Sequence, residues 1–199
     1  MGEDSRGGSC LTRPLERRAA LKVCLGLALG LNFARPAAAA AVDPRSERPR
    51  EGDQLVFADG DQTGRVVVPN DLSLGGPRVT AFPIDPATRV VRDGSRLNKL
   101  LVVRLDPGSL AEETHARAAG GVVAYSAICT HQGCEVMAWE DATKTLWCPC
   151  HDSKYDPRDN GRVVAGPAPR RLAALPLKLV DGVLTVAGGF SGPVGGQTH

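Results

Sequence analysis

Two short segments that combine cysteine with histidine constrain this 199-residue chain more than any other feature. Residues 129–134 read Cys-Thr-His-Gln-Gly-Cys, and residues 148–156 read Cys-Pro-Cys-His-Asp-Ser-Lys-Tyr-Asp. Each segment offers one thiolate and one imidazole as metal ligands, together with one further cysteine. Sixteen residues separate His131 from Cys148, which is enough for a hairpin that brings the segments together. The sequence therefore predicts one site built from two loops.

The use of cysteine supports a metal site. Cys10 and Cys24 lie near the N-terminus, and the other four cysteines fall within residues 129–150. Cysteines gathered in this way serve a site rather than a general disulfide framework. Two cysteines and two histidines also suit tetrahedral zinc. However, Cys-x-His is tighter than the usual spacing of paired zinc ligands, and zinc leaves the two further cysteines unexplained.

The rest of the pattern favours β-structure. Short β-branched segments alternate with Gly, Pro, Asn and Asp, which is typical of strands joined by turns. We expect a hairpin turn at Asp181-Gly182 and one helix over residues 110–119, with Ser109 as its cap and Glu112 completing a capping box. The predicted fold is an all-β, small antiparallel sandwich or barrel with the site on loops at one end. The expected strands are 64–68, 78–84, 99–105, 121–127, 143–148, 162–165, 175–180 and 183–187.

Both motifs resemble the Rieske family, whose pattern is Cys-x-His followed by Cys-x-x-His at the spacing found here. The Gly-Pro-Ala-Pro segment 166–169 is similar to the proline-containing loop beside the family's cluster. The resemblance covers residues 120–187 and implies one [2Fe–2S] cluster and a Rieske-type fold. It implies that one iron is bound by Cys129 and Cys148 and the other by His131 and His151. Replacing two thiolates by neutral imidazoles raises the reduction potential.

The two further cysteines point to one branch of this family. In the high-potential branch, cysteines placed like Cys134 and Cys150 form a disulfide that ties the loops together over the cluster. Such a bond persists in an oxidising compartment. The alternative is a pair of free buried thiols. Soluble Rieske ferredoxins and ring-hydroxylating oxygenases generally lack the pair, which argues against a cytoplasmic oxygenase component.

Two hydroxyl groups match the same branch. The resemblance directs the Ser153 hydroxyl at a bridging sulfide and the Tyr155 hydroxyl at the Cys129 sulfur. Donors to sulfur stabilise the more negative reduced cluster and so raise the potential. The alternatives are a surface serine and a packing tyrosine. Asp152 departs from the glycine common in the respiratory branch, and its charge beside His151 is expected to lower the potential or alter docking.

The N-terminal segment 1–41 reads as an export leader. It carries a net charge of +3 against +2 for the whole chain, which leaves −1 for the rest and gives no indication of nucleic-acid binding. Arg17-Arg18, the apolar run 23–33 and the alanine stretch 37–41 follow the order of a signal peptide. The paired arginines resemble a twin-arginine signal, which exports folded proteins, although Ala20 replaces the preferred Phe. The alternative is a membrane anchor, but the run falls short of the ~20 residues that span a bilayer.

The remaining chain divides by composition. We expect a linker at 42–54, a β-rich part of uncertain role at 55–119, a cluster-binding domain at 120–187 and a flexible tail at 188–199. Solvated positions are expected for His115 and His199, and packing roles for Trp139 and Trp147.

Three functions are compatible with this reading, all of them one-electron transfer on the periplasmic side of the inner membrane. The first is the iron–sulfur subunit of a cytochrome bc-type complex, with quinol, cytochrome b and a c-type cytochrome as partners. The second is the small subunit of a periplasmic molybdenum oxidase resembling arsenite oxidase. The third is a stand-alone periplasmic carrier. In the first two, the chain is an electron-transfer subunit of an oxidoreductase complex.

Overall fold

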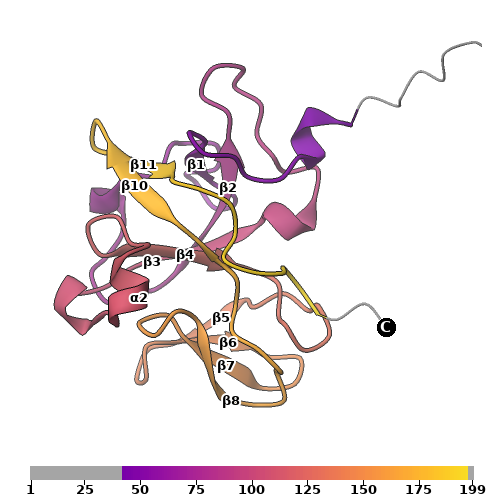
Figure 1. Ribbon diagram of the computed structural model, residues 1–199, viewed down its shortest axis with the longest axis vertical. Coiled ribbons are helices and arrows are strands. Elements are labelled where there is room, and N and C mark those ends of the chain that lie inside the picture. The colour runs from indigo at the N-terminus through magenta and orange to yellow at the C-terminus, as the bar shows by residue number, and fades with distance from the viewer. Residues whose placement is uncertain (1–41, 197–199) are drawn as a thin grey trace, which may run out of the picture. The chain divides into compact units, whose positions relative to one another are not determined.

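The computed structural model describes residues 42–196, so the predicted leader lies outside the described residues. Two antiparallel sheets make up the fold (Figure 1). The first has the order β10 (Leu177–Val180), β11 (Val183–Val186), β1 (Gln54–Phe57), β2 (Val79–Ile84), β3 (Leu100–Arg104), β4 (Val122–Ser126) and β9 (Ala174–Leu175). The second has the order β5 (Ala138–Glu140), β6 (Thr145–Cys148), β7 (Ser153–Asp156) and β8 (Arg162–Ala165).

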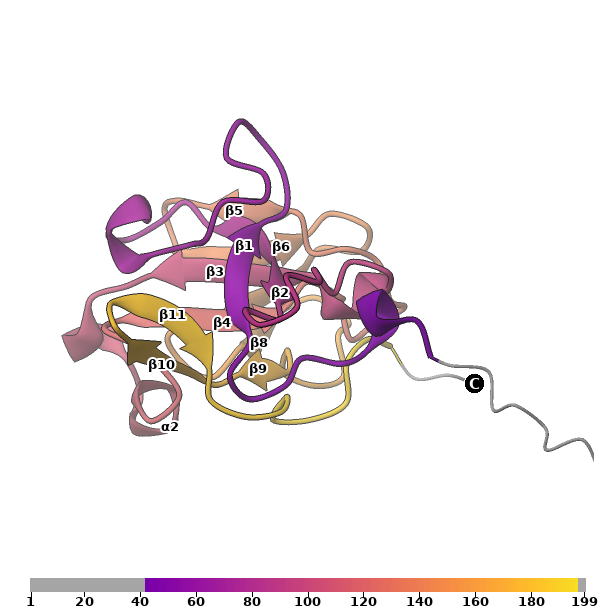
Figure 2. The same ribbon diagram turned by 90° about the horizontal axis from the view of Figure 1, so that it is seen from above.

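The larger sheet curls into a near-closed barrel. Its two edge strands, β9 and β10, are consecutive in the chain and are separated only by Pro176. Because this one residue joins opposite edges of the sheet, the strands must curve round to meet, as the view from above shows (Figure 2). The predicted all-β architecture is therefore confirmed.

Strands β3 and β4 lie between two hydrophobic cores. Leu100 and Ala124 face the inside of the barrel with the other residues of the first core. Leu101 and Tyr125 face the opposite way, into a second core shared with the smaller sheet. Because successive side chains of a strand point to opposite faces, both faces of β4 are buried. The smaller sheet, which carries the second cysteine segment, is thereby fixed against the barrel.

Most predicted strands are present within a residue or two, and Asp181-Gly182 forms the expected turn with φ of 51° and 78°. The strand predicted at 64–68 is wrong: Val66 makes one isolated bridge to Val56, and Pro69, which has no N–H for a ladder, begins a 3₁₀ turn. Strands β1, β5 and β7 were not predicted. The 3₁₀ helices are η1 (Pro44–Ser46), η2 (Pro69–Asp71), η3 (Arg96–Asn98) and η4 (Pro107–Ser109).

The predicted helix is much shorter than expected. Of the predicted residues 110–119, only those of α2 (Glu112–His115) are α-helical, and Ser109 does not cap this helix. The Ser109 hydroxyl instead donates to Asp106 O at 2.7 Å, within the turn of η4. Among residues 42–196, no helix has the length and apolarity needed to cross a bilayer.

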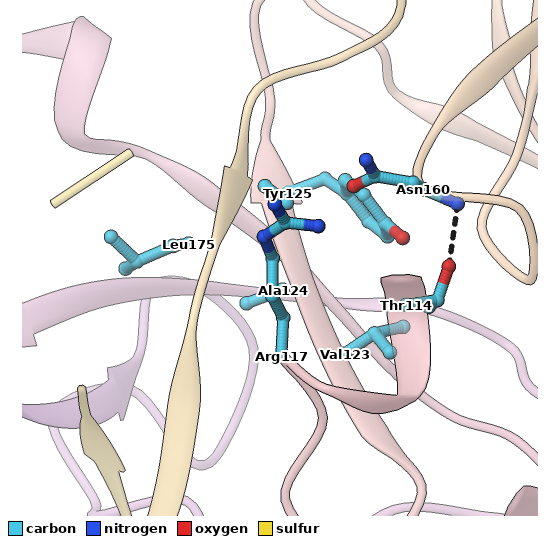
Figure 3. A pocket seen from close by; sticks show the side chains of 8 residues that line it. Thr114, Arg117, Val123, Ala124, Tyr125, Asn160 and Leu175 are labelled. Atoms are coloured by element: carbon cyan, nitrogen blue, oxygen red, sulfur yellow. Dashed lines mark hydrogen bonds between the residues drawn. The ribbon is translucent and has the colours of Figure 1, made fainter. Parts of the chain in front are cut away.

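A small pocket marks where α2 meets the two sheets (Figure 3). Asn160 N donates to Thr114 Oγ1 at 2.7 Å, which ties the turn after β7 to α2. The Tyr125 hydroxyl donates to Pro157 O at 2.8 Å, which ties that turn to β4. None of the four predicted cluster ligands lines this pocket. The pocket therefore belongs to the packing between α2 and the sheets and is not part of the site.

The predicted linker and tail both contact the barrel. Asp53 accepts two hydrogen bonds from the buried Arg92, at 2.6 and 3.0 Å. Within the predicted tail, Ser191 exchanges hydrogen bonds with Ala174 at 2.8 and 2.9 Å. Both segments are thus integrated into the fold over the described residues.

Candidate metal centre

The first cysteine loop follows β4. Cys129 N donates to Cys134 O at 2.7 Å, and Gly133 N donates to Cys129 O at 3.1 Å. These two hydrogen bonds close the loop on itself, and Gly133 makes the tight turn with a φ of 74°, which glycine adopts without strain. The Cys129 side chain is buried, whereas His131 is half-buried.

The second cysteine loop is the turn between β6 and β7. Cys148 and Ser153 face each other as the last pair of this hairpin, so residues 149–152 form its tip. Cys148 is buried and His151 is exposed. Asp152 closes the turn with a φ of 58°, a left-handed conformation that Asp and Asn tolerate better than most residues.

The β5–β6 hairpin brings the two loops together, as the spacing of the motifs predicts. The rings of His131 and His151 meet edge to face with their centroids 4.7 Å apart. The two thiols lie deeper: burial, together with the adjacent Cys129, raises the pKa of Cys148 to about 12. The site thus has a buried cysteine pair beneath a more exposed histidine pair.

This arrangement fits a two-iron cluster. Within residues 42–196, no three His, Cys, Asp or Glu side chains converge so that they could hold one metal ion. A Rieske cluster takes two protein ligands at each iron, a cysteine pair at one and a histidine pair at the other. Bound cations would also favour the thiolate form of Cys148, whose pKa burial raises.

Two buried polar atoms at the site have no partner among the described residues, namely His131 Nδ1 and Ser153 Oγ. Leaving buried polar atoms unpaired is costly, so a group that binds both would stabilise the fold. An iron would use the ring nitrogen, and a bridging sulfide would accept the Ser153 hydroxyl. The role of Ser153 as a donor to a bridging sulfide stays a prediction.

Tyr155 reaches from β7 into the first loop. Its hydroxyl lies 3.1 Å from Cys129 Sγ and accepts a hydrogen bond from Thr130 N at 3.2 Å. The tyrosine O–H can donate to this sulfur, and Thr130 Oγ1 at 3.3 Å is the other acceptor within reach. Burial, together with Cys129, raises the pKa of Tyr155, so the group remains a donor.

The further cysteine of each loop sits at the mouth of the site. Cys134 is half-buried and Cys150 exposed, and both thiols are free in the structure. They lie close enough that Cys150 is the main cause of a raised pKa at Cys134. A disulfide between them stays a prediction.

A third loop, which carries the Gly-Pro-Ala-Pro sequence, lies directly against the second. A Cβ placed on Gly166 would lie 2.5 Å from both Asp152 O and Ser153 Cα. Only glycine permits the two loops to come this close. Ala168, two residues further along the third loop, packs on the second core.

Sequence reasoning missed three side chains around the loops. The Thr130 hydroxyl donates to Arg170 O at 2.6 Å, and Trp147 Nε1 donates to Asp152 Oδ1 at 3.1 Å. Arg96 donates to Gly133 O at 2.7 Å. Thr130 occupies the variable position of Cys-x-His, and nothing in the residue pattern marks the other two.

The known proteins of similar sequence are Rieske proteins, which agrees with the geometry of the two cysteine loops. Residues 87–176 match the Rieske [2Fe-2S] domain family. A protein named as a respiratory nitrate reductase Rieske subunit, from Haloferax mediterranei, is 41% identical over 150 residues, which cover 74% of this chain and 63% of the relative. The cytochrome bc1 complex Rieske iron-sulfur subunit of Streptomyces lividans is 41% identical over 98 residues, or 48% of this chain and 58% of that protein.

The bc1 Rieske subunit of Mycobacterium tuberculosis is 30% identical over 161 residues, covering 71% of this chain and 37% of its own length. This chain thus spans less than two thirds of the length of each of these curated relatives. The fold, the two loops and the family match show that the chain contains a Rieske domain, which implies a [2Fe–2S] cluster.

Proposed function

We propose that Cys129, His131, Cys148 and His151 hold one [2Fe–2S] cluster, and that the chain is the iron–sulfur subunit of a bc-type quinol:cytochrome c oxidoreductase. The observation that carries this proposal is the Tyr155 hydroxyl, 3.1 Å from the sulfur of Cys129. A donor at a ligand sulfur favours the reduced state and suits a high-potential carrier. The relatives named as bc1 Rieske subunits support the choice of complex.

When bound, the cluster supplies a one-electron couple, and the surrounding residues set its environment. The exposed ring of His151 is the more accessible of the two histidines and would accept a hydrogen bond from quinol. In this proposal the partners are cytochrome b and a c-type cytochrome, and the domain lies on the periplasmic side of the inner membrane. The twin-arginine-like leader would deliver it there folded and would then be cleaved or retained as an anchor.

A second candidate is an electron-transfer subunit of a periplasmic oxidoreductase with a molybdenum-containing catalytic subunit. The relative named as a nitrate reductase Rieske subunit is 41% identical over 74% of this chain, whereas the Mycobacterium tuberculosis bc1 subunit is 30% identical over 71%. That higher identity over a similar extent favours a non-bc1 partner as the second candidate. A stand-alone periplasmic carrier is the remaining alternative.

Purification from the native host tests the proposal. The protein should carry two irons and two acid-labile sulfides, and its reduced form should give a Rieske electron paramagnetic resonance signal. Stoichiometric zinc without labile sulfide would refute cluster binding. Extraction in mild detergent should recover b- and c-type haem together with the chain, and a His151→Ala variant should keep the haem partners but lose quinol-driven cytochrome c reduction. A molybdopterin subunit in place of cytochrome b would select the second candidate.

A further inference from the structure

Three arginines from distant parts of the chain gather beside the first cysteine loop. Arg96, in η3, donates to Gly133 O at 2.7 Å, so its guanidinium is fixed on that loop. The tail reaches the same place, because a Cβ on Gly196 would lie 3.0 Å from both Gly133 N and His131 O. The yellow tail runs down to this loop in Figure 1.

The other two arginines are attached to the same tail and to η3. Arg170 donates through Nη1 to Pro193 O at 3.1 Å and through Nη2 to Gly195 O. Arg48 donates to Leu97 O at 3.2 Å and shares a surface pocket with Pro193. We call Arg48, Arg96 and Arg170 the arginine face.

The charge of the arginine face is not neutralised within the described residues. Among residues 42–196, no carboxylate oxygen lies within 4.0 Å of these three guanidiniums, whereas nearby Arg45 and Arg50 pair with Asp93 and Glu47. Backbone carbonyls hold the three groups in place but carry no net charge. The result is three fixed positive charges, two of them on exposed side chains.

The acidic groups close to the loops do not cancel this excess. Glu135 is paired with Lys99 at 2.5 Å. Asp152 is exposed on the second loop, where it accepts a hydrogen bond from Trp147, and contributes one negative charge against three positive ones. The arginine face therefore keeps a positive field next to His131.

We propose that the arginine face is the docking surface for an electron-transfer protein that presents an acidic surface. The inference rests on the proposed electron transfer through the adjacent loops. A partner must come close to the redox centre for rapid electron transfer, and opposite charges steer and orient such encounters. A protein partner is favoured over an anionic membrane because the arginine face adjoins His131, whose ring lies 4.7 Å from that of His151.

Small inorganic oxidants of opposite charge test the proposal on the full-length, cluster-loaded protein. Ferricyanide and tris(phenanthroline)cobalt(III) each take one electron from the reduced protein, and stopped-flow absorbance follows the rate. In about 10 mM salt, Arg48→Gln, Arg96→Gln or Arg170→Gln should each slow ferricyanide about two- to fourfold and accelerate the cobalt complex. The differences should vanish near about 1 M salt, where screening acts over about 3 Å.

Arg104→Gln is the matched control. Arg104 also donates only to a carbonyl, Pro69 O at 3.2 Å. It is, however, the last residue of β3, at the end of the strand that lies away from the cysteine loops. Its removal should leave both rates unchanged, and Arg96→Lys should restore the ferricyanide rate. The reduction potential and iron content should be unchanged in all variants.

Three outcomes would overturn the docking proposal. The first is an equal effect of Arg104→Gln, and the second is a fall in both rates together, which would indicate a disturbed loop. The third is arginine-dependent binding to phosphatidylglycerol vesicles with unchanged oxidant rates, which would assign the arginine face to a membrane surface. A wild-type protein that lacks a reducible cluster would instead refute the proposed function.

Discussion

Tyr155 links the two cysteine loops through a single oxygen atom. Its hydroxyl lies 3.1 Å from Cys129 Sγ and receives the Thr130 N–H. A hydrogen bond to a ligand sulfur gains strength when the cluster is reduced. If that gain is about 1–1.5 kcal/mol, on the scale of one hydrogen bond, Tyr155→Phe should lower the potential by roughly 45–65 mV. Protein-film voltammetry at fixed pH measures this shift.

Iron content should not change in Tyr155→Phe, because the ring and its packing are kept. Ser153→Ala should lower the potential in the same direction, and the double variant should fall further. An unchanged potential in Tyr155→Phe would mean that Tyr155 only packs.

Asp152 places a carboxylate next to the predicted ligand His151. Asp152→Asn removes the charge but keeps a side chain that tolerates the left-handed turn and can accept from Trp147. At a solvated surface the lost repulsion is on the order of 0.5–1 kcal/mol, so the potential should rise by about 20–45 mV. Asp141→Asn is the control, because Asp141 likewise accepts from a tryptophan, Trp139, at 3.3 Å. Equal shifts in both variants would contradict a local effect of Asp152.

Among the loops, the contact between the second and third depends on Gly166. With Ala at this position, the Cβ would lie 2.5 Å from Ser153 Cα at a φ of 81°. The loops would have to separate, at a cost of about 1–3 kcal/mol. Gly166→Ala should therefore lower both the iron-to-protein ratio and the free energy of unfolding.

Gly182→Ala is the control, because it introduces the same backbone strain without affecting the contact between the loops. Gly182 has a similar φ of 78° but open space around its Cβ, so its replacement should destabilise the fold while the iron content stays normal. Loss of iron from Gly182→Ala as well would remove the specific role of Gly166.

The predicted Cys134–Cys150 disulfide would close a loop of known length. A crosslink over roughly 15 residues stabilises a fold by about 3 kcal/mol in the chain-entropy account. Cys150→Ser should therefore leave the four predicted ligands in place but lower the stability and potential of the cluster. Dithiothreitol should reproduce the effect on the wild type. Mass mapping that finds both thiols free in native protein would remove this argument for the high-potential branch.

Across the whole molecule, the sequence predicts local features better than long-range ones. The hairpin at Asp181-Gly182 and the meeting of the two cysteine loops depend on short spacings, and both predictions are confirmed. Strands β5 and β7 were missed because they are short and mixed in polarity, and β1 because its apolar run is only three residues long. Their partners in the sheet, rather than their own residues, decide their conformation.

The predicted role of residues 42–54 also shows that long-range contacts are hard to predict from the sequence. Their charge and prolines are typical of a linker, but Glu47 and Asp53 meet Arg92, which lies about forty residues further along the chain. No local pattern reveals that pairing. The arginine face likewise could not be predicted from the sequence, because its three arginines come from three distant segments.

The buried ion pair of Arg92 with Asp53 gives the sharpest test that this segment belongs to the fold. Arg92 is 2% exposed and Asp53 3%, and Arg92 Nη1 also lies 2.9 Å from Glu47 Oε2. Removing one partner of a buried pair leaves an uncompensated charge and costs about 3–5 kcal/mol. Because Glu47 remains, Asp53→Asn should lower the free energy of unfolding by roughly 2–4 kcal/mol, as measured by denaturant titration.

Asp93→Asn is the control for this last prediction. Asp93 pairs with Arg45, whose side chain is 60% exposed, and pairs at the surface are worth about 0–1 kcal/mol. The reduction potential should be the same in both variants, since the Arg92 pair lies in the barrel and not among the cysteine loops. If Asp53→Asn were no more destabilising than Asp93→Asn, residues 42–54 would behave as the free linker that their composition predicts. A large loss of stability with an unchanged potential would instead make the segment a structural part of the barrel, independent of the redox site.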